Sequence, residues 1–108
     1  MNCEGRLKSI LDDLHRGLKE VLGADLDSIV LYGSQARGDA KDESDVDILC
    51  IMRDAFDYGE LILRTSGVSA AVSLEYDVVV CTTFVARWDY ENRNTPFLMN
   101  VRRNSVPA

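Results

Sequence analysis

Three aspartates, Asp45, Asp47 and Asp77, lie beside or within apolar runs and point most directly to chemistry. Asp45 and Asp47 are two residues apart, so in a strand both side chains leave the same face, with Cα atoms about 6–7 Å apart. Two carboxylates placed there repel each other unless a cation lies between them. A hard divalent ion that takes oxygen ligands, above all Mg²⁺, meets that need.

Asp77 belongs to a later apolar run, EYDVVVC, which is typical of a strand. If this strand neighbours the first, the third carboxylate lies roughly 4.8 Å from the pair. Three carboxylates on one sheet face can hold two ions about 3.5–4 Å apart, and such a pair supports in-line displacement at phosphorus. We therefore predict a two-ion site made by Asp45, Asp47 and Asp77.

A glycine–serine pair, Gly33-Ser34, ends an earlier apolar run and supplies the other half of the predicted site. Glycine lets the backbone turn tightly and approach a ligand closely. Free amides at the start of the following helix, together with the Ser34 hydroxyl, suit a phosphate group. Arg37, one turn further on, can add a charge-assisted contact.

Each of these residues also has an ordinary structural explanation. Ser34 can be a helix N-cap worth about 1 kcal/mol, Asp45 a turn residue, and Arg37 a solvated side chain. An acid near the start of a strand, such as Asp77, is not unusual. Asp47 differs, because it interrupts the apolar run VDILCIM, where an unpaired carboxylate is costly. The combination, more than any single residue, favours a functional site.

The elements that must position these residues follow from periodicity. Residues 4–22 carry a stripe of apolar residues at helical spacing and end at Gly23. We predict strands over 28–32, 46–52 and 75–81, a short helix over 35–38 and a polar loop over 39–44. We also predict a helix from Phe56 to about Leu74 with a possible break near Gly67, a helix capped by Thr82 or Thr83 through about Tyr90, a turn over 91–95, and a last helix from Pro96 to Asn104. This order indicates one α/β (α+β) domain over residues 1–108, with a small mixed sheet flanked by helices.

Bulk composition limits the classes of function. The chain has 108 residues and a net charge of −6, from 12 basic and 18 acidic residues, and this acidity disfavours direct binding of nucleic acid. No apolar run approaches the roughly 18 residues of a membrane span, and no signal peptide is evident. Three cysteines without a CxxC pair indicate neither a disulfide framework nor a zinc site, so we expect a cytoplasmic protein with Cys50 and Cys81 as small core residues. We expect His15 at the surface, and Arg102 and Arg103 on a solvated C-terminal face that could meet an acidic partner.

Gly33-Ser34, ten intervening residues and Asp45-Val46-Asp47 resemble the GS-x10-DxD signature of the polymerase-beta-like nucleotidyltransferase superfamily. The string LYGSQARGDAKDESDVDILCIM resembles the minimal nucleotidyltransferases, the antitoxin partners of HEPN-domain toxins. The resemblance is strong over residues 30–52, looser up to about Val101, and includes Thr95-Pro96-Phe97 as the start of the family's closing helix.

The resemblance implies the polymerase-beta-like fold and an enzyme that transfers AMP from ATP to a tyrosine hydroxyl of a HEPN-family RNase toxin, thereby neutralising it. It implies that Gly33 and Ser34 hold the triphosphate, that Asp45 and Asp47 bind Mg²⁺, and that Asp77 is the third acid. The last residues, 104–108, depart from the family's pattern, which bears on partner docking more than on catalysis. We also see no separate substrate domain, so we expect a partner protein to supply the acceptor.

Two other functions remain open at this stage. The chain could neutralise its partner by binding alone, without catalysis. It could also transfer a nucleotide to a small hydroxylated molecule such as an aminoglycoside, although so short a chain leaves little to build a second pocket wall.

Overall fold

The computed structural model describes residues 3–33 and 45–108 and shows a four-stranded mixed sheet flanked by helices. The strands are β1 (Leu26–Tyr32), β2 (Val46–Met52), β3 (Val80–Ala86) and the short β4 (Val106–Pro107). Their order in the sheet is β3-β2-β1-β4, with β1 antiparallel to β2 and to β4, and β2 parallel to β3. The predicted fold class, a small mixed sheet with helices, is confirmed.

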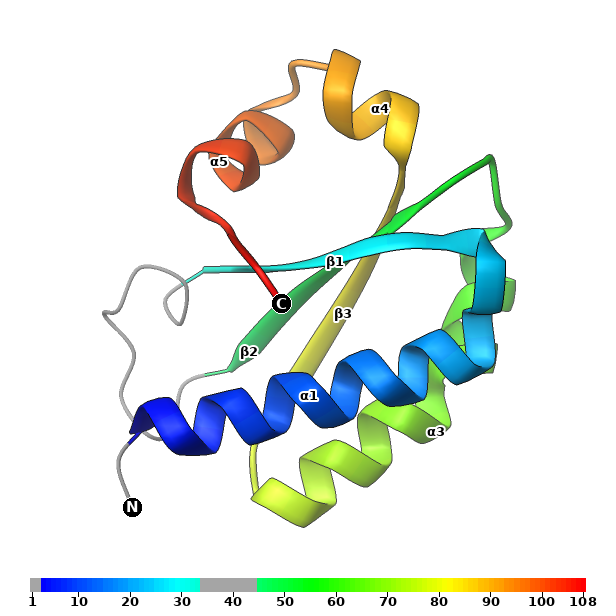
Figure 1. Cartoon of the computed structure of the whole chain (residues 1–108). Coiled ribbons are helices and arrows are strands. Elements are labelled where there is room, and N and C mark those ends of the chain that lie inside the picture. The colour runs from blue at the N-terminus through cyan, green and yellow to red at the C-terminus, as the bar shows by residue number, and fades with distance from the viewer. Residues whose placement is uncertain (1–2, 34–44) are drawn as a thin grey trace.

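Two long helices cover one face of the sheet (Figure 1). α1 (Cys3–Leu22) buries its apolar stripe, and α3 (Tyr58–Tyr76) lies beside it. The main core forms between these helices and the inward side chains of the strands, which include Leu14, Leu18, Ile48, Cys50 and Phe84. A 3₁₀ turn, Gly23–Asp25, joins α1 to β1.

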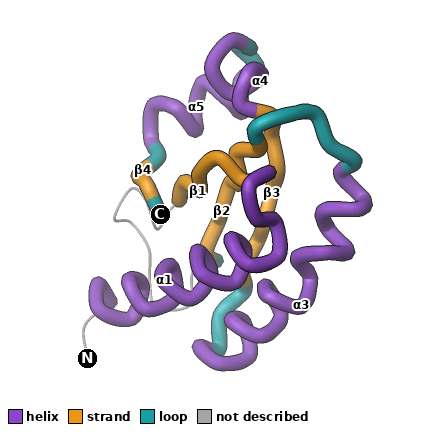
Figure 2. The backbone as a smooth tube through the Cα atoms, turned by 45° about the vertical axis from the view of Figure 1, so that its right-hand side comes forward, coloured by secondary structure: helices purple, strands orange, loops and turns teal. Residues whose placement is uncertain are grey.

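The opposite face is covered by the two short helices α4 (Arg87–Asn92) and α5 (Pro96–Asn104), as Figure 2 shows. Val101 of α5 is fully buried against Leu49 and Ile51 of β2. This second core is small, because it leaves the other end of the same face, where β2 begins, without a covering helix among the described residues.

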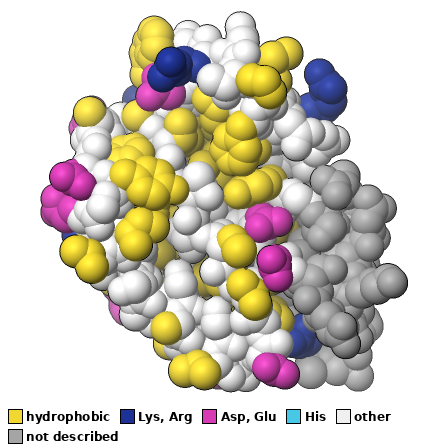
Figure 3. Space-filling model, turned by 180° about the vertical axis from the view of Figure 1, so that it is seen from behind, with side chains coloured by type: hydrophobic (Ala, Val, Ile, Leu, Met, Phe, Trp, Pro, Cys, Tyr) yellow, Lys and Arg dark blue, Asp and Glu magenta, His cyan; other side chains and the backbone are white. Residues whose placement is uncertain are grey.

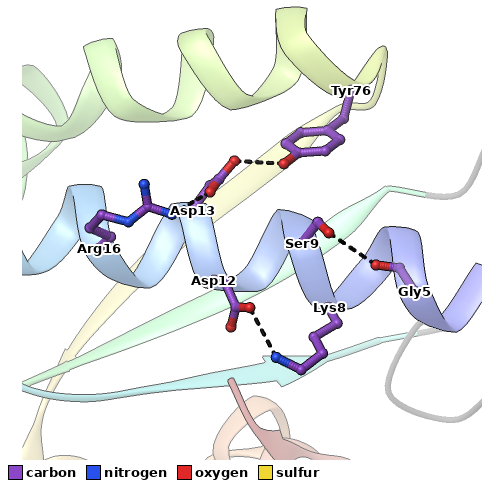
Figure 4. Close-up of polar contacts among 7 residues, drawn as sticks. All are labelled: Gly5, Lys8, Ser9, Asp12, Asp13, Arg16 and Tyr76. Atoms are coloured by element: carbon purple, nitrogen blue, oxygen red, sulfur yellow. Dashed lines mark hydrogen bonds and ion pairs between the residues drawn. The ribbon is translucent and has the colours of Figure 1, made fainter.

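Side-chain contacts fix the junction between α1 and α3 (Figure 4). The Tyr76 hydroxyl donates to Asp13 Oδ2 at 2.6 Å, and Arg16 contacts the other oxygen of that carboxylate at 2.6 Å. Arg6 donates to the Tyr76 carbonyl. The bond to Asp13 is the main cause that raises the pKa of Tyr76 to about 12.

The predictions for α1, β1 and β2 are confirmed, and the last helix has the predicted bounds, with Thr95 as its N-cap. α3 runs without the break that Gly67 suggested. The predicted helix over 35–38 and loop over 39–44 lie outside the described residues. β4 was not predicted. No helix in the described ranges has the length and apolar character needed to cross a membrane.

The third strand was predicted in the wrong place. Residues 75 and 76 finish α3, Asp77 is its C-cap in the left-handed conformation with φ 54°, and β3 starts at Val80. The contacts of Tyr76 with α1 hold this last helical turn and override the strand propensity of the run. Consequently Thr82 and Thr83 lie in β3 and cap no helix, and α4 begins at Arg87 and extends into the predicted turn.

Candidate active site

The closest approach in the candidate site joins Gly33, directly after β1, to Asp47 in β2. Gly33 adopts φ +78°, and a Cβ atom added to it would lie 2.4 Å from Asp47 Oδ2. The antiparallel ladder sets this approach, because Tyr32 pairs with Asp47. Only glycine suits the position, since any larger residue would be strained in its backbone and would meet the carboxylate.

Asp45 and Asp47 lie at the start of β2 on the face that carries α5, as the two-residue spacing predicted. Asp47 is half-buried and Asp45 is exposed. Burial first, and the charge of Asp45 second, raise the pKa of Asp47. Among the described residues neither carboxylate forms an ion pair with a lysine or arginine. The site is therefore acidic, partly desolvated and suited to a cation.

Cys81 of β3 is a site residue that the sequence did not reveal. It pairs with Asp47 in the parallel ladder, and its Sγ lies 4.0 Å from Asp45 Oδ2, at the outer limit of a sulfur hydrogen bond. Burial and then the two carboxylates raise the pKa of its thiol. We expected a core cysteine here, and Cys50 is one, but Cys81 is only half-buried. The strand register, which periodicity alone does not provide, would have identified it.

An aromatic side chain forms the wall next to the carboxylates. The Tyr32 ring reaches from β1 across β2, so that its hydroxyl lies 3.3 Å from Thr83 Oγ1 in β3. Phe97 of α5 meets the ring edge-on, with ring centroids 5.5 Å apart. Burial is the main cause that raises the pKa of Tyr32. Tyr32 thus connects α5 to the strands that carry the acids, and neither it nor Thr83 was predicted as a site residue.

Of the remaining predicted site residues, only Asp77 lies in the described part of the chain, and it does not join this pair. Asp77 caps α3, three residues before β3 begins, and no group of three or more His, Cys, Asp or Glu side chains among the described residues is placed to hold a metal ion. Ser34 and Arg37 lie outside the described residues. His15 is exposed as predicted, whereas Arg102 donates to the carbonyls of Tyr90 and Arg93 and to Asn94 Oδ1, which corrects its interpretation as a merely solvated side chain.

The donor set of the pair fits a hard divalent cation. Two carboxylates on one face offer oxygen ligands, and the carboxylate of Asp47 is partly removed from water without a described cationic partner. Figure 3 shows acidic side chains among apolar ones on one face of the molecule. Asp45 and Asp47 are the residues that would hold such an ion, and a side chain at position 33 would crowd the Asp47 carboxylate.

Comparison with known proteins agrees with this geometry. A family model described as the nucleotidyltransferase domain matches residues 9–100. Two proteins of Methanocaldococcus jannaschii, each provisionally named a protein adenylyltransferase, are similar to this chain. One is 47% identical over 51 residues, which are 47% of this chain but about a third (35%) of that protein's length. The other is 31% identical over 71 residues, which are 66% of this chain and 71% of that protein.

Solved structures share the fold at low sequence identity. One chain of a toxin–antitoxin crystal structure with AMP-PNP has a TM-score of 0.65 at 18% identity, covering 89% of this chain and 69% of that chain. A mutant of the toxin–antitoxin MntA–HpeT gives 0.64 at 17% identity, covering 91% and 70%. A provisionally assigned minimal nucleotidyltransferase gives 0.58 at 20% identity, covering 94% and 95%. The family model spans most of the sequence, and this chain belongs to the nucleotidyltransferase domain family.

Proposed function

We propose that this protein is an antitoxin that transfers AMP from ATP to a tyrosine hydroxyl of a HEPN-family RNase toxin, in a reaction that requires Mg²⁺. Membership of the nucleotidyltransferase domain family supports the transfer of a nucleotide. The relatives named protein adenylyltransferases support a protein acceptor and AMP as the group transferred. The likeness to chains of toxin–antitoxin structures, one with AMP-PNP, supports a toxin as the partner.

The observation that carries the proposal is the contact between Gly33 and Asp47, with Asp45 on the same face. A half-buried carboxylate whose pKa is raised by burial and by a neighbouring acid does not stabilise the folded protein in its ionised form. Such an arrangement persists where a function requires the ionised pair. The glycine with φ +78° serves the same arrangement, because it leaves the carboxylate in place and keeps the backbone close to any ligand.

The residues of this chain then have separate roles. Asp45 and Asp47 would hold a divalent ion, which, when bound, would neutralise the charge that develops on the triphosphate. Gly33, with Ser34 and Arg37 from the motif, cradles the phosphates of ATP. Tyr32, braced by Thr83 and Phe97, forms the wall beside the carboxylates. Asp77 as a third ligand stays a sequence prediction, and the assignment of the metal rests on Asp45 and Asp47.

The acceptor hydroxyl must approach from solvent on the side of the exposed Asp45. An acceptor hydroxyl held in line with the scissile P–O bond attacks the α-phosphate and gives up its proton, a loss that a bound divalent ion would favour. The proton then passes to a carboxylate or to water, and pyrophosphate leaves. An acceptor delivered by a second protein suits a site with the exposed Asp45 at the start of β2.

The test is to incubate this protein, ATP and Mg²⁺ with its cognate toxin and to weigh the intact toxin by mass spectrometry. We expect the toxin to gain the mass of one adenylyl group, and we expect Asp45→Asn and Asp47→Asn to abolish that gain. Asp12→Asn is the matched control, because Asp12 is an exposed acid of α1 that pairs with the exposed Lys8 at 3.0 Å. A complex that forms without any gain of mass would overturn the proposal, and neutralisation by the two Asn variants would indicate that binding alone suffices.

A further inference from the structure

The outer face of α3 is apolar and uncovered, which is unusual for a surface helix. Its inner face, with Leu61, Thr65 and Val72, is buried against α1 and the sheet. On the outer face Leu63 is 79% exposed and Leu74 is 84% exposed. A surface helix normally presents charged residues to water, but this one has three charged residues in its 19. Figure 2 shows α3 at the margin of the molecule, with α1 on one side of it.

The exposed residues Leu63, Gly67, Ala70 and Leu74 form a single seam, which we call the α3 seam. Their spacing of four, three and four residues is that of a helix–helix contact. Gly67 lies inside the helix, where glycine costs stability, and a Cβ atom added to it would meet nothing within 4 Å. Packing within the chain therefore does not require this glycine, whereas a helix docked on the seam could approach closely there.

The α3 seam is also palindromic, which identifies its occupant. Its outer positions carry leucine and its inner positions carry small residues, symmetrically about the point between residues 68 and 69. In an antiparallel pair of identical helices, Leu63 of each copy meets Leu74 of the other, and Gly67 meets Ala70. A two-fold interface requires this self-complementarity, because each contact must occur twice with the partners exchanged.

We propose that the protein forms a two-fold symmetric homodimer through antiparallel packing of α3 on α3. Small residues at the centre let the helix axes approach to about 8 Å. Beside the seam, Arg64 lies 4.0 Å from Glu60 within its own chain. The acidic pair at Asp47 lies on the other face of the sheet, so both active sites stay open to a partner.

The expected affinity is moderate. The seam from Leu63 to Leu74 is about 17 Å long and the helix is about 10 Å across. Such a contact buries less than the roughly 800 Å² per partner that is typical of stable interfaces. We therefore expect a reversible dimer whose fraction rises with concentration between about 1 μM and about 1 mM.

The test is sedimentation velocity of the full chain over this concentration range, with variants that introduce charges into the α3 seam. Leu63→Glu and Leu74→Lys each place a charge against a leucine twice in every dimer, so each should weaken association at least about tenfold. The double variant L63E/L74K should recover it, because each introduced carboxylate then faces an introduced ammonium. Met99→Glu, a charge at an exposed apolar residue of α5, is the matched control and should leave association unchanged.

Both leucines are exposed, so the single variants should keep the fold, and circular dichroism checks this. A mixture of the two single variants should form more dimer than either variant alone, because one of the two contacts becomes a charge pair. The proposal is overturned if the wild-type chain stays monomeric up to the highest concentration. It is equally overturned if its dimer survives both single substitutions, or if neither the double variant nor the mixture recovers association.

Discussion

Replacing Gly33 by alanine should damage the active site far more than it damages the fold. Gly33 has φ +78°, a left-handed conformation that costs a residue with a side chain about 1–2 kcal/mol. The unfolded alanine variant has a lower conformational entropy than the unfolded wild type, and this offsets part of the cost, by about 0.4–1 kcal/mol. The backbone effect alone therefore predicts a loss of about 1 kcal/mol in the free energy of unfolding.

The second effect of this substitution acts on Asp47. The new Cβ would lie 2.4 Å from Oδ2, and ordinary contact begins at 3.4 Å, so the carboxylate must retreat by about 1 Å. A displacement of that size in a reacting group can reduce a rate about 100-fold, which corresponds to about 2.7 kcal/mol in the activation free energy. We expect a comparable weakening of Mg²⁺-dependent ATP binding.

Gly23 provides the matched control. It also has a positive φ, +57°, but a Cβ atom there would meet nothing within 4 Å. Gly23→Ala should thus lose a similar amount of stability in urea denaturation and retain its AMP-transfer rate and its Mg²⁺-dependent ATP binding by calorimetry. Equal transfer rates in the two variants would refute the reasoning, since the contact with Asp47 would then have no consequence.

Three further predictions test other parts of the structure. Because the pKa of Asp47 is raised in the folded state, its ionised form costs stability; this cost is absent below the unfolded pKa and complete above the folded pKa. Asp47→Asn should therefore raise the melting temperature at pH 7 without metal, and it should remove the further rise that we expect Mg²⁺ to give the wild type. A lower melting temperature of the variant without metal would contradict this. Arg102→Ala removes three charge-assisted bonds to α4 and the segment that follows it, and should cost about 1–3 kcal/mol in urea denaturation, while the exposed Arg103→Ala should cost nothing measurable. Gly67→Ala should stabilise the dilute monomer by up to about 1 kcal/mol, because the added Cβ meets open space. Gly17→Ala should destabilise the monomer, because its added Cβ would lie 2.7 Å from Val68 Cγ1. A change of the same sign in the free energy of unfolding of both variants would count against the described helix packing.

The elements that could be predicted from the sequence are those whose local signals agree with their tertiary contacts. α1 has an unbroken apolar stripe, and its buried residues are the ones that periodicity selects. α5 begins with Thr95, whose side chain accepts from the Leu98 amide at 3.2 Å, and with a proline in its first turn. From Ile48 to Met52 β2 is a continuous apolar run, because both of its faces are buried there.

The start of β3 could not be predicted, because the run from Glu75 to Cys81 suits a strand and contacts distant in sequence decide otherwise. Ser73 shapes the turn that follows α3: its carbonyl accepts from the Val78 amide at 3.1 Å, and its hydroxyl accepts from the Val80 amide at 3.3 Å. Together with the bond from Tyr76 to Asp13, this extends the helix to residue 76 and places Asp77 in a left-handed C-cap. Because β3 starts at Val80, its register places Cys81 opposite Asp47. The residues predicted to begin this strand do not lie opposite Asp47.

The two halves of the sequence motif turn out to form one structural unit. The sequence suggests that Gly33 serves a phosphate and that Asp47 serves a metal, as separate tasks ten or more residues apart. The ladder between β1 and β2 pairs Tyr32 with Asp47, so the residue after Tyr32 must pass directly beneath that carboxylate. A side chain at position 33 would collide with Oδ2, and therefore glycine is required there even before any nucleotide binds. It follows that substitutions at Gly33 and Asp47 should not be additive: once Asp47→Ala has removed the carboxylate, Gly33→Ala should cost only its backbone conformation.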